Sequence, residues 1–447
     1  MGVEQIPIED KKRRNALLCE QNCANAFSCI PIEWRRMKGF GKTSLQAVTM
    51  KLACAVFLLA AALLLAGCSG FWNLPSSSSS TSTTPTTLSS GVFYVMNQTA
   101  MQIAAYSIVS GTLTPLSGSP YSSGVAPGAT PYSMAIAPGG GYLYLSTVSG
   151  IYAYSITTNG FLSIANGGSP ISSDIAYAMQ VGPNGTWLID AFINTGGQVQ
   201  LDATPLNSSG TYLIGANVPS VAFTITNASV KQMALSPDGK NLFVALGAGG
   251  TIIVPFTASS SSPLGATARG IPVANTGGSA LSVAVDPSDR LFYIGETLAS
   301  SSASSGGLRA FNYSSLSGTL TQASGSPIAS GGLAPNDILP EASGNYVYVA
   351  NGQGTSGSGN VAWFPISASG TTYTIAAGSS VATGIQPLGL AEDSNKNFVL
   401  AVSSGGSTSS GNPDLEAYTM SSGALTAAIT SATGTDPVGA AAIAALP

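Results

Sequence analysis

Residues 92–447 are predicted to form an all-β domain, and three observations support that prediction. A unit of about fifty residues repeats along this stretch, each copy contains four short strand-like segments, and no 3.6-residue helical pattern is present. The 53 Gly and 26 Pro residues suit many tight turns, and 44% hydrophobic residues can build a core. Four-stranded sheets repeated around an axis are typical of a β-propeller, which is therefore the predicted fold.

The clearest repeated piece is a turn followed by an aromatic, alternating strand. It reads PGGGYLYL from Pro138 and PDGKNLFV from Pro237. Pro presets the turn and Gly or Asn tolerates a positive φ, while the alternation suits a strand. Copies of this piece begin at Pro138, Pro183, Pro237, Pro287, Ala342 and Asp393.

Three further strands accompany this piece in each repeat. The strand before the turn is rich in small residues, as in 132–137 and 231–236, which suits the crowded axis of a propeller. A third strand follows the aromatic one. The fourth occurs in nearly identical form at 110–120 and 317–327, which are 207 residues, or four repeats, apart.

Counting the repeats predicts seven blades of four antiparallel strands. The seventh blade is split: residues 92–120 supply strands two to four, and residues 437–444 supply its first strand. Pairing of the two ends would close the ring and remove exposed sheet edges. The six complete blades are predicted to begin near Pro131, Ala176, Val230, Ala280, Pro335 and Pro387.

Residues 1–67 are predicted to be a signal region that is removed on export. A basic segment precedes the apolar run 52–66, which is short for a membrane span. The Leu-Ala-Gly-Cys sequence ending at Cys68 resembles the bacterial lipobox, which implies lipidation of Cys68 and anchoring to the bacterial membrane. A translation start at Met37 or Met50 would give a more conventional signal and is the alternative. Residues 68–91, rich in Ser, Thr and Pro, are expected to be a tether.

Charge and composition exclude several function classes. Residues 68–447 carry six basic and fourteen acidic side chains, which disfavours nucleic-acid binding. The chain has no His, and all five Cys lie within residues 1–68, so no metal site and no cofactor are expected. Asp414 and Glu416 alternate along one strand and are expected to face solvent.

The repeats resemble the YVTN-type seven-bladed propellers of the lactonase family, which includes 6-phosphogluconolactonases. The resemblance lies in PDGKNLFV from Pro237, NYVYVAN from Asn345 and SGTLT from Ser317, and it extends over 92–447. These are turn and packing residues, so the resemblance implies the fold more than the activity. Enzymes of this family commonly use His and Arg at the central face, and this chain has no His.

Five residues near the starts of first strands are the candidate site. Lys231, Asn336 and Asp337 are expected near the mouth of the central channel, where propellers usually bind ligands. Tyr132 and Tyr177 occupy neighbouring positions and could stack on a sugar ring, but packing in the core is the role expected first for both.

Two functions remain open. The first is a binding or scaffold module at the cell envelope, whose partner would be a glycan, a lactone or an envelope protein. The second is a lactone hydrolase, in which Lys231 would polarise the carbonyl group and Asp337 or Glu296 would activate water. The absence of His and the scarcity of charge favour binding.

Overall fold

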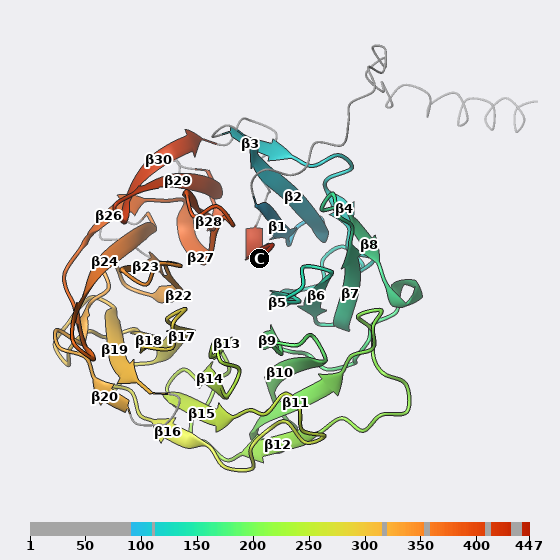
Figure 1. The fold of residues 1–447 in the computed structure, drawn as a ribbon, viewed down its shortest axis with the longest axis horizontal. Coiled ribbons are helices and arrows are strands. Elements are labelled where there is room, and N and C mark those ends of the chain that lie inside the picture. The colour runs from blue at the N-terminus through green and yellow to red at the C-terminus, as the bar shows by residue number, and fades with distance from the viewer. Residues whose placement is uncertain (1–90, 110–111, 315–319, 353–357, 407–412, 431–439) are drawn as a thin grey trace, which may run out of the picture. The chain divides into compact units, whose positions relative to one another are not determined.

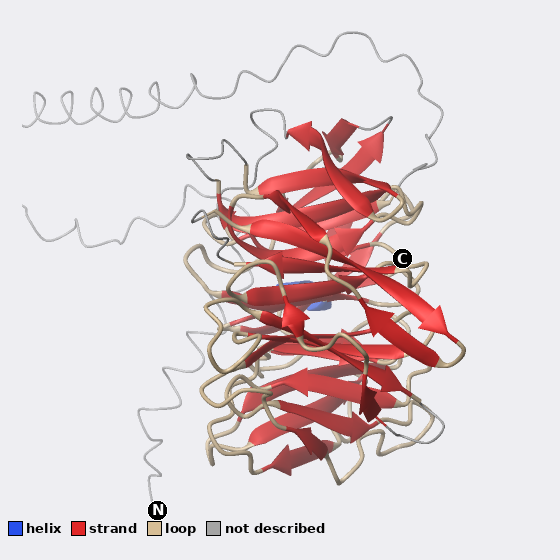
Figure 2. Ribbon diagram, turned by 90° about the vertical axis from the view of Figure 1, so that its left-hand side faces the viewer, coloured by secondary structure: helices blue, strands red, loops and turns tan. Residues whose placement is uncertain are grey.

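Seven antiparallel sheets surround a common axis (Figure 1). The computed structural model describes residues 91–447 except 110–111, 315–319, 353–357, 407–412 and 431–439. Within them strands predominate, and the one helix is a 3-10 turn, η1 (Asn166–Gly168) (Figure 2). The predicted seven-bladed propeller of four-stranded sheets is confirmed. The predicted signal region and Cys68 lie outside the described residues.

Each blade consists of an inner, a second, a third and an outer strand, and the inner strand is closest to the axis (Figure 1). The inner strands of blades 1 to 7 are β31 (Ala440–Ala445), β5 (Pro131–Ile136), β9 (Ala178–Val181), β13 (Gln232–Leu235), β17 (Ala280–Val285), β22 (Pro335–Pro340) and β27 (Ile385–Glu392). The second strands, in the same order, are β1 (Val92–Asn97), β6 (Tyr142–Thr147), β10 (Trp187–Ile193), β14 (Asn241–Ala245), β18 (Leu291–Glu296), β23 (Tyr346–Asn351) and β28 (Phe398–Gly405).

The outer half of each blade completes the four strands. The third strands of blades 1 to 7 are β2 (Gln102–Val109), β7 (Gly150–Ile156), β11 (Val199–Pro205), β15 (Thr251–Pro255), β19 (Gly307–Tyr313), β24 (Asn360–Ser369) and β29 (Leu415–Ser421). The outer strands are β3 (Thr112–Pro115), β8 (Leu162–Ile164), β12 (Ser220–Phe223), β16 (Arg269–Ile271), β20 (Leu320–Gln322), β25 (Thr372–Ile375) and β30 (Ala424–Thr430). Three short strands pair with third strands: β4 (Tyr121–Ser122), β21 (Ile328–Ala329) and β26 (Ser379–Ala382).

The two ends of the described chain meet in blade 1. Strand β31 pairs with β1 in an antiparallel register that places Phe93 opposite Ala445 and Val95 opposite Ile443. The C-terminus therefore lies beside β1, close to the axis (Figure 1). The predicted closure of the ring is confirmed.

The blades are held together by apolar contacts at every interface. Seven clusters of buried hydrophobic residues occur among the described residues, one between each pair of neighbouring blades. Tyrosines on second strands also reach across these interfaces. The Tyr94 hydroxyl donates to the carbonyl oxygen of Gly160 in blade 2 at 2.7 Å, and Tyr144 donates to Gly210 in blade 3 at 3.0 Å. Both faces of each sheet are thus covered by a neighbouring blade.

The double coverage corrects one sequence-based expectation. Asp414 and Glu416 are only 5% and 6% exposed, so the expectation that they face solvent is wrong. Alternation marks a solvent-facing side only when one face of a sheet is open to water, and here neither is. Glu416 instead accepts a 2.6 Å hydrogen bond from the Tyr418 hydroxyl.

A bulge at the start of the inner strand recurs around the ring. In blade 2, Pro131 and Ser133 pair with two consecutive residues of β6, so Tyr132 between them has no pairing partner and is an extra residue. Asn336 is the extra residue of blade 6 for the same reason. In blade 3, the N–H of Tyr177 donates to the carbonyl oxygen of Ala191, which is also the pairing partner of Ala178. Two residues of the inner strand thus face one residue of β10, and Tyr177 is the extra one. Bulges redirect side chains next to functional sites. The extra residues in blades 1 to 7 are Ala441, Tyr132, Tyr177, Lys231, Leu281, Asn336 and Leu388.

None of the helices in the described part of the chain has the length and apolar character that crossing a bilayer requires.

We predict that deleting residues 437–447 destabilises the whole domain, because blade 1 loses its inner strand and the β1 edge is exposed. In the full chain, Ala444→Pro should cost about 1–3 kcal/mol, since Ala444 pairs with Tyr94 and a proline removes a hydrogen bond of the β1–β31 ladder. Thermal and denaturant unfolding would measure both effects. Ala444→Ser is the matched control and should remain close to wild type. Unchanged melting of the deleted chain would contradict ring closure as a source of stability.

Candidate functional site in the axial channel

The inner strands surround a cavity of about 190 Å³ on the axis of the ring. Six of the seven blades contribute to its wall, including the C-terminal residues Ala441, Ala442 and Ile443 of blade 1. Its volume is below the roughly 300–1,000 Å³ of drug-sized sites, so it suits a ligand the size of a single ring.

The residues at the bulges supply much of this wall. Of the seven extra residues, all except Leu281 line the cavity. All five residues predicted from the sequence are therefore brought together: Tyr132, Tyr177, Lys231, Asn336 and Asp337. Their roles in binding or catalysis remain predictions.

Tyr132 and Tyr177 form the aromatic side of the cavity. Their ring centroids lie 4.9 Å apart with an interplanar angle of 64°, an edge-to-face contact between blades 2 and 3. Tyr177 is 40% exposed, which is unusual for a large side chain that only packs a core. The pair can therefore pack together and still offer a ring face to a ligand.

Lys231 and Asn336 form the polar side. The ammonium group of Lys231 is exposed and forms no ion pair or hydrogen bond with the described residues. The side-chain amide of Asn336 donates to the carbonyl oxygen of Pro387 at 3.0 Å, which fixes its orientation. Its amide oxygen has no partner within the described part of the chain and can accept a hydrogen bond from a ligand hydroxyl.

Asp337 is tied into the ring by three hydrogen bonds. Its Oδ1 accepts from the Gln232 side chain at 2.5 Å and from the backbone N–H of Ile338 at 2.9 Å. Its Oδ2 accepts from the backbone N–H of Leu390 at 2.7 Å. Asp337 thus links blades 4, 6 and 7, and most of its acceptor positions are occupied.

The same position of the inner strand joins other blades as well. The side-chain oxygens of Ser133 and Gln232 accept from the backbone N–H groups of Met179 and Val283, at 3.2 and 2.8 Å, in the following blades. The position after the bulge is therefore a structural link in blades 2, 4, 5 and 6, where Ser133, Gln232, Ser282 and Asp337 occupy it.

Burial raises the pKa of Asp337 to about 6, although its three hydrogen bonds favour the charged form. The carboxyl group therefore titrates close to neutral pH. A group with such a pKa can accept a proton under physiological conditions.

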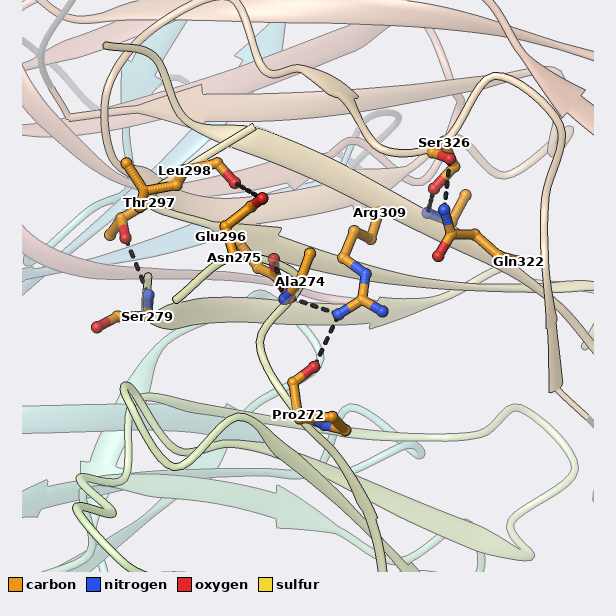
Figure 3. Close-up of polar contacts among 11 residues, drawn as sticks. Pro272, Ala274, Asn275, Ser279, Glu296, Thr297, Leu298, Arg309, Gln322 and Ser326 are labelled. Atoms are coloured by element: carbon orange, nitrogen blue, oxygen red, sulfur yellow. Dashed lines mark hydrogen bonds and ion pairs between the residues drawn. The ribbon is translucent and has the colours of Figure 1, made fainter. Parts of the chain in front are cut away.

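Glu296, the other predicted base, lies elsewhere. It forms a buried ion pair with Arg309 at 2.7 Å and accepts from the backbone N–H of Ala274 at 3.0 Å (Figure 3). Arg309 also donates to the carbonyl oxygen of Pro272, so the pair fastens the segment before blade 5 (Figure 3). Glu296 is not among the cavity-lining residues, so the structure does not bring it together with Lys231 and Asp337.

Sequence reasoning missed Gln180 and Gln232, which also line the cavity. Gln180 donates to the carbonyl oxygen of Met233 in blade 4 at 3.0 Å, and Gln232 holds Asp337. An alignment of the repeats carries a signal for Gln232, because it shares a column with Ser133, Ser282 and Asp337 in otherwise apolar strands.

The ring and its cavity define the chain as a seven-bladed propeller with a ligand-sized axial site. Its fold is similar to that of a Bacteroides uniformis protein described as a proposed 6-phosphogluconolactonase: identity is 18%, the TM-score is 0.58, and the match covers 80% of this chain and 99% of that one. The periplasmic gluconolactonase of Pseudomonas aeruginosa is similar at 16% identity and a TM-score of 0.59, with the same coverage of both chains. No family model and no curated protein matches the sequence.

We predict a pH-dependent contribution of Asp337 to stability. Its folded pKa of about 6 lies above the ordinary value of 3.8, so ionising it opposes folding as the pH rises from about 4 to about 6. Wild type should lose about 2 kcal/mol relative to Asp337→Asn between pH 4 and pH 7. Urea unfolding of both proteins across this range measures the difference, and parallel pH profiles would contradict the raised pKa.

Proposed function

We propose that this protein is a binding module that holds a small sugar-like ring in its axial cavity. The observation that carries the proposal is that one small cavity is lined both by an edge-to-face tyrosine pair and by Lys231, whose ammonium group has no partner among the described residues. The flat ring of a tyrosine packs against the apolar face of a sugar, while Lys231 and Asn336 can bond to its oxygens.

The state of Asp337 favours binding over hydrolysis. A general base needs an accessible lone pair within hydrogen-bond reach of the attacking water. The carboxylate of Asp337 already accepts three hydrogen bonds, two of which join blade 6 to blades 4 and 7. It is the one acid among the described residues that line the cavity. Removing it would disturb the ring as well as any chemistry.

Lactone hydrolysis is the second candidate, and the pKa of about 6 at Asp337 favours it. In this reaction Asp337 would take a proton from water, the hydroxide would add to the lactone carbonyl, and the ring C–O bond would break. The leaving alkoxide would then take up the proton, while Lys231 stabilises the carbonyl oxygen. The proteins of similar fold described as lactonases support this candidate by analogy.

We predict that Lys231→Met and Tyr132→Ala each weaken binding of sugars and sugar lactones about tenfold or more, since each removes about 1.4 kcal/mol of contact. Isothermal titration calorimetry with neutral and acidic monosaccharides and their lactones would measure the affinities. Lys240→Met is the matched control, because Lys240 is 56% exposed and pairs with Asp238.

Lactone turnover would separate the two candidates. A binding module should show no turnover of the same lactones. Turnover that Asp337→Ala abolishes while the protein stays folded would overturn the binding proposal and establish hydrolysis.

The protein is further proposed to act at the bacterial cell envelope, anchored through lipidated Cys68. The support is the apolar run 52–66 and the lipobox-like sequence before Cys68. The Pseudomonas aeruginosa gluconolactonase of similar fold is periplasmic, which agrees with export. The Ser/Thr/Pro-rich stretch up to residue 91 would then act as a spacer.

We predict that the chain expressed with its natural leader in a bacterium incorporates labelled palmitate and partitions into detergent. Cys68→Ala should abolish both, because the acyl chains attach at that residue. Cys54→Ala, inside the apolar run, is the control and should behave as wild type. Labelling that persists in Cys68→Ala would contradict the anchor.

A further inference from the structure

A group of acids without counter-charge lies between blades 2 and 3. Residues 91–230 contain three charged side chains, Asp174, Asp190 and Asp202, and no Lys or Arg. Asp190 of β10 is directly opposite Asp202 of β11. Burial raises the pKa of Asp190 well above its ordinary value, and Asp174 and Asp202 raise it further. Like charges opposite each other destabilise a sheet, so this arrangement requires an explanation.

Asp190 occupies a position that is apolar in neighbouring blades. It lies on the second strand of its blade and pairs with Met179 of the inner strand. The equivalent position of the second strand is occupied in blades 2, 4 and 5 by Leu145, Val244 and Ile294. Asp190 is 0% exposed, and neither of its carboxyl oxygens has a hydrogen-bond partner. Such orphaned polar groups are rare in native proteins and point to a bound water or ion.

A second orphaned oxygen enters the same interface from the other side. Ser146 of β6 is 0% exposed, and its hydroxyl has no partner. Its neighbour Leu145 packs toward blade 1, so Ser146 points toward blade 3. Ile189 and Ala191 pack toward blade 4, so Asp190 points toward blade 2.

We propose that the interface between blades 2 and 3 binds a hard metal cation of the calcium type, with Asp190 as its charged ligand. Ser146 supplies a neutral oxygen, and Asp202, on the same side of its sheet, supplies a second carboxylate. An all-oxygen set selects calcium-like ions over zinc or copper. The described residues hold no group of three or more His, Cys, Asp or Glu side chains able to share a metal, so two carboxylates are the upper limit.

The charge balance of the region supports this assignment. A buried carboxylate must be paired with a cation or take up a proton. The chain offers no basic side chain in blades 1 to 3. Asp202 already accepts a 2.9 Å hydrogen bond from Gln200, which orients it. With few charged ligands, the site should be weak, with a dissociation constant of roughly 0.1–1 mM, like extracellular calcium modules.

The test is the melting temperature of the full chain, freed of metal with EDTA, as CaCl2 is raised to 10 mM at constant ionic strength and neutral pH. We expect a saturable rise, and equilibrium dialysis with radioactive calcium should find about one ion per chain. Asp190→Asn should lose the rise yet melt in EDTA at or above wild type, because its amide carries no charge. Ser146→Ala should raise the calcium concentration at half-saturation several-fold.

Asp289→Asn, in blade 5, is the matched control and should keep the full calcium response. If Asp190→Asn does not fold, Asp190→Leu replaces it in the test, because leucine is the residue at the equivalent position of blade 2, Leu145. The proposal is overturned if wild type shows no calcium-dependent rise, which would mean that a proton neutralises Asp190. It is equally overturned if the rise persists without the Asp190 carboxylate.

Discussion

The pairing of β31 with β1 is the contact on which the rest of the structure depends. It joins residues separated by about 350 positions, pairs β1 on both sides, and converts six complete blades and one partial blade into a closed ring. The site depends on it directly, because Ala441, Ala442 and Ile443 form part of the cavity wall. Stability and ligand binding should therefore be lost together when the ring opens.

The inner strands convert this closed ring into a site. Each begins with an extra residue, which lines the axial cavity in six of the seven blades. In several blades the side chain of the following residue bonds to a neighbouring blade. Two roles are thus assigned to adjacent positions: Asn336 is available to a ligand, while Asp337 holds blades together. This division explains how a nearly uncharged chain can present a specific site, and why Asp337 cannot be judged a base from its location alone.

Much of the fold could be predicted because a propeller repeats its local signals. The turn at Pro237 and the strand after it recur often enough to give the number of blades. Because the small-residue strand precedes each turn at a similar distance, the repeat also predicted that Lys231 and Asn336 lie near the axis. Contacts between blades were not predictable, since they join residues such as Gln232 and Asp337 that are 105 positions apart. The surroundings of Glu296 could not be predicted for the same reason. Its partners, Arg309 and the backbone N–H of Ala274, come close to it only in the folded blade.

A crystal structure of the protein soaked with a sugar lactone and, separately, with the corresponding sugar acid would test the central claim most directly. The account predicts electron density for one ring in the axial cavity, with its face against Tyr132 or Tyr177 and an oxygen within hydrogen-bond distance of Lys231. Density at another surface, or an axial cavity filled only by water at saturating ligand, would contradict it.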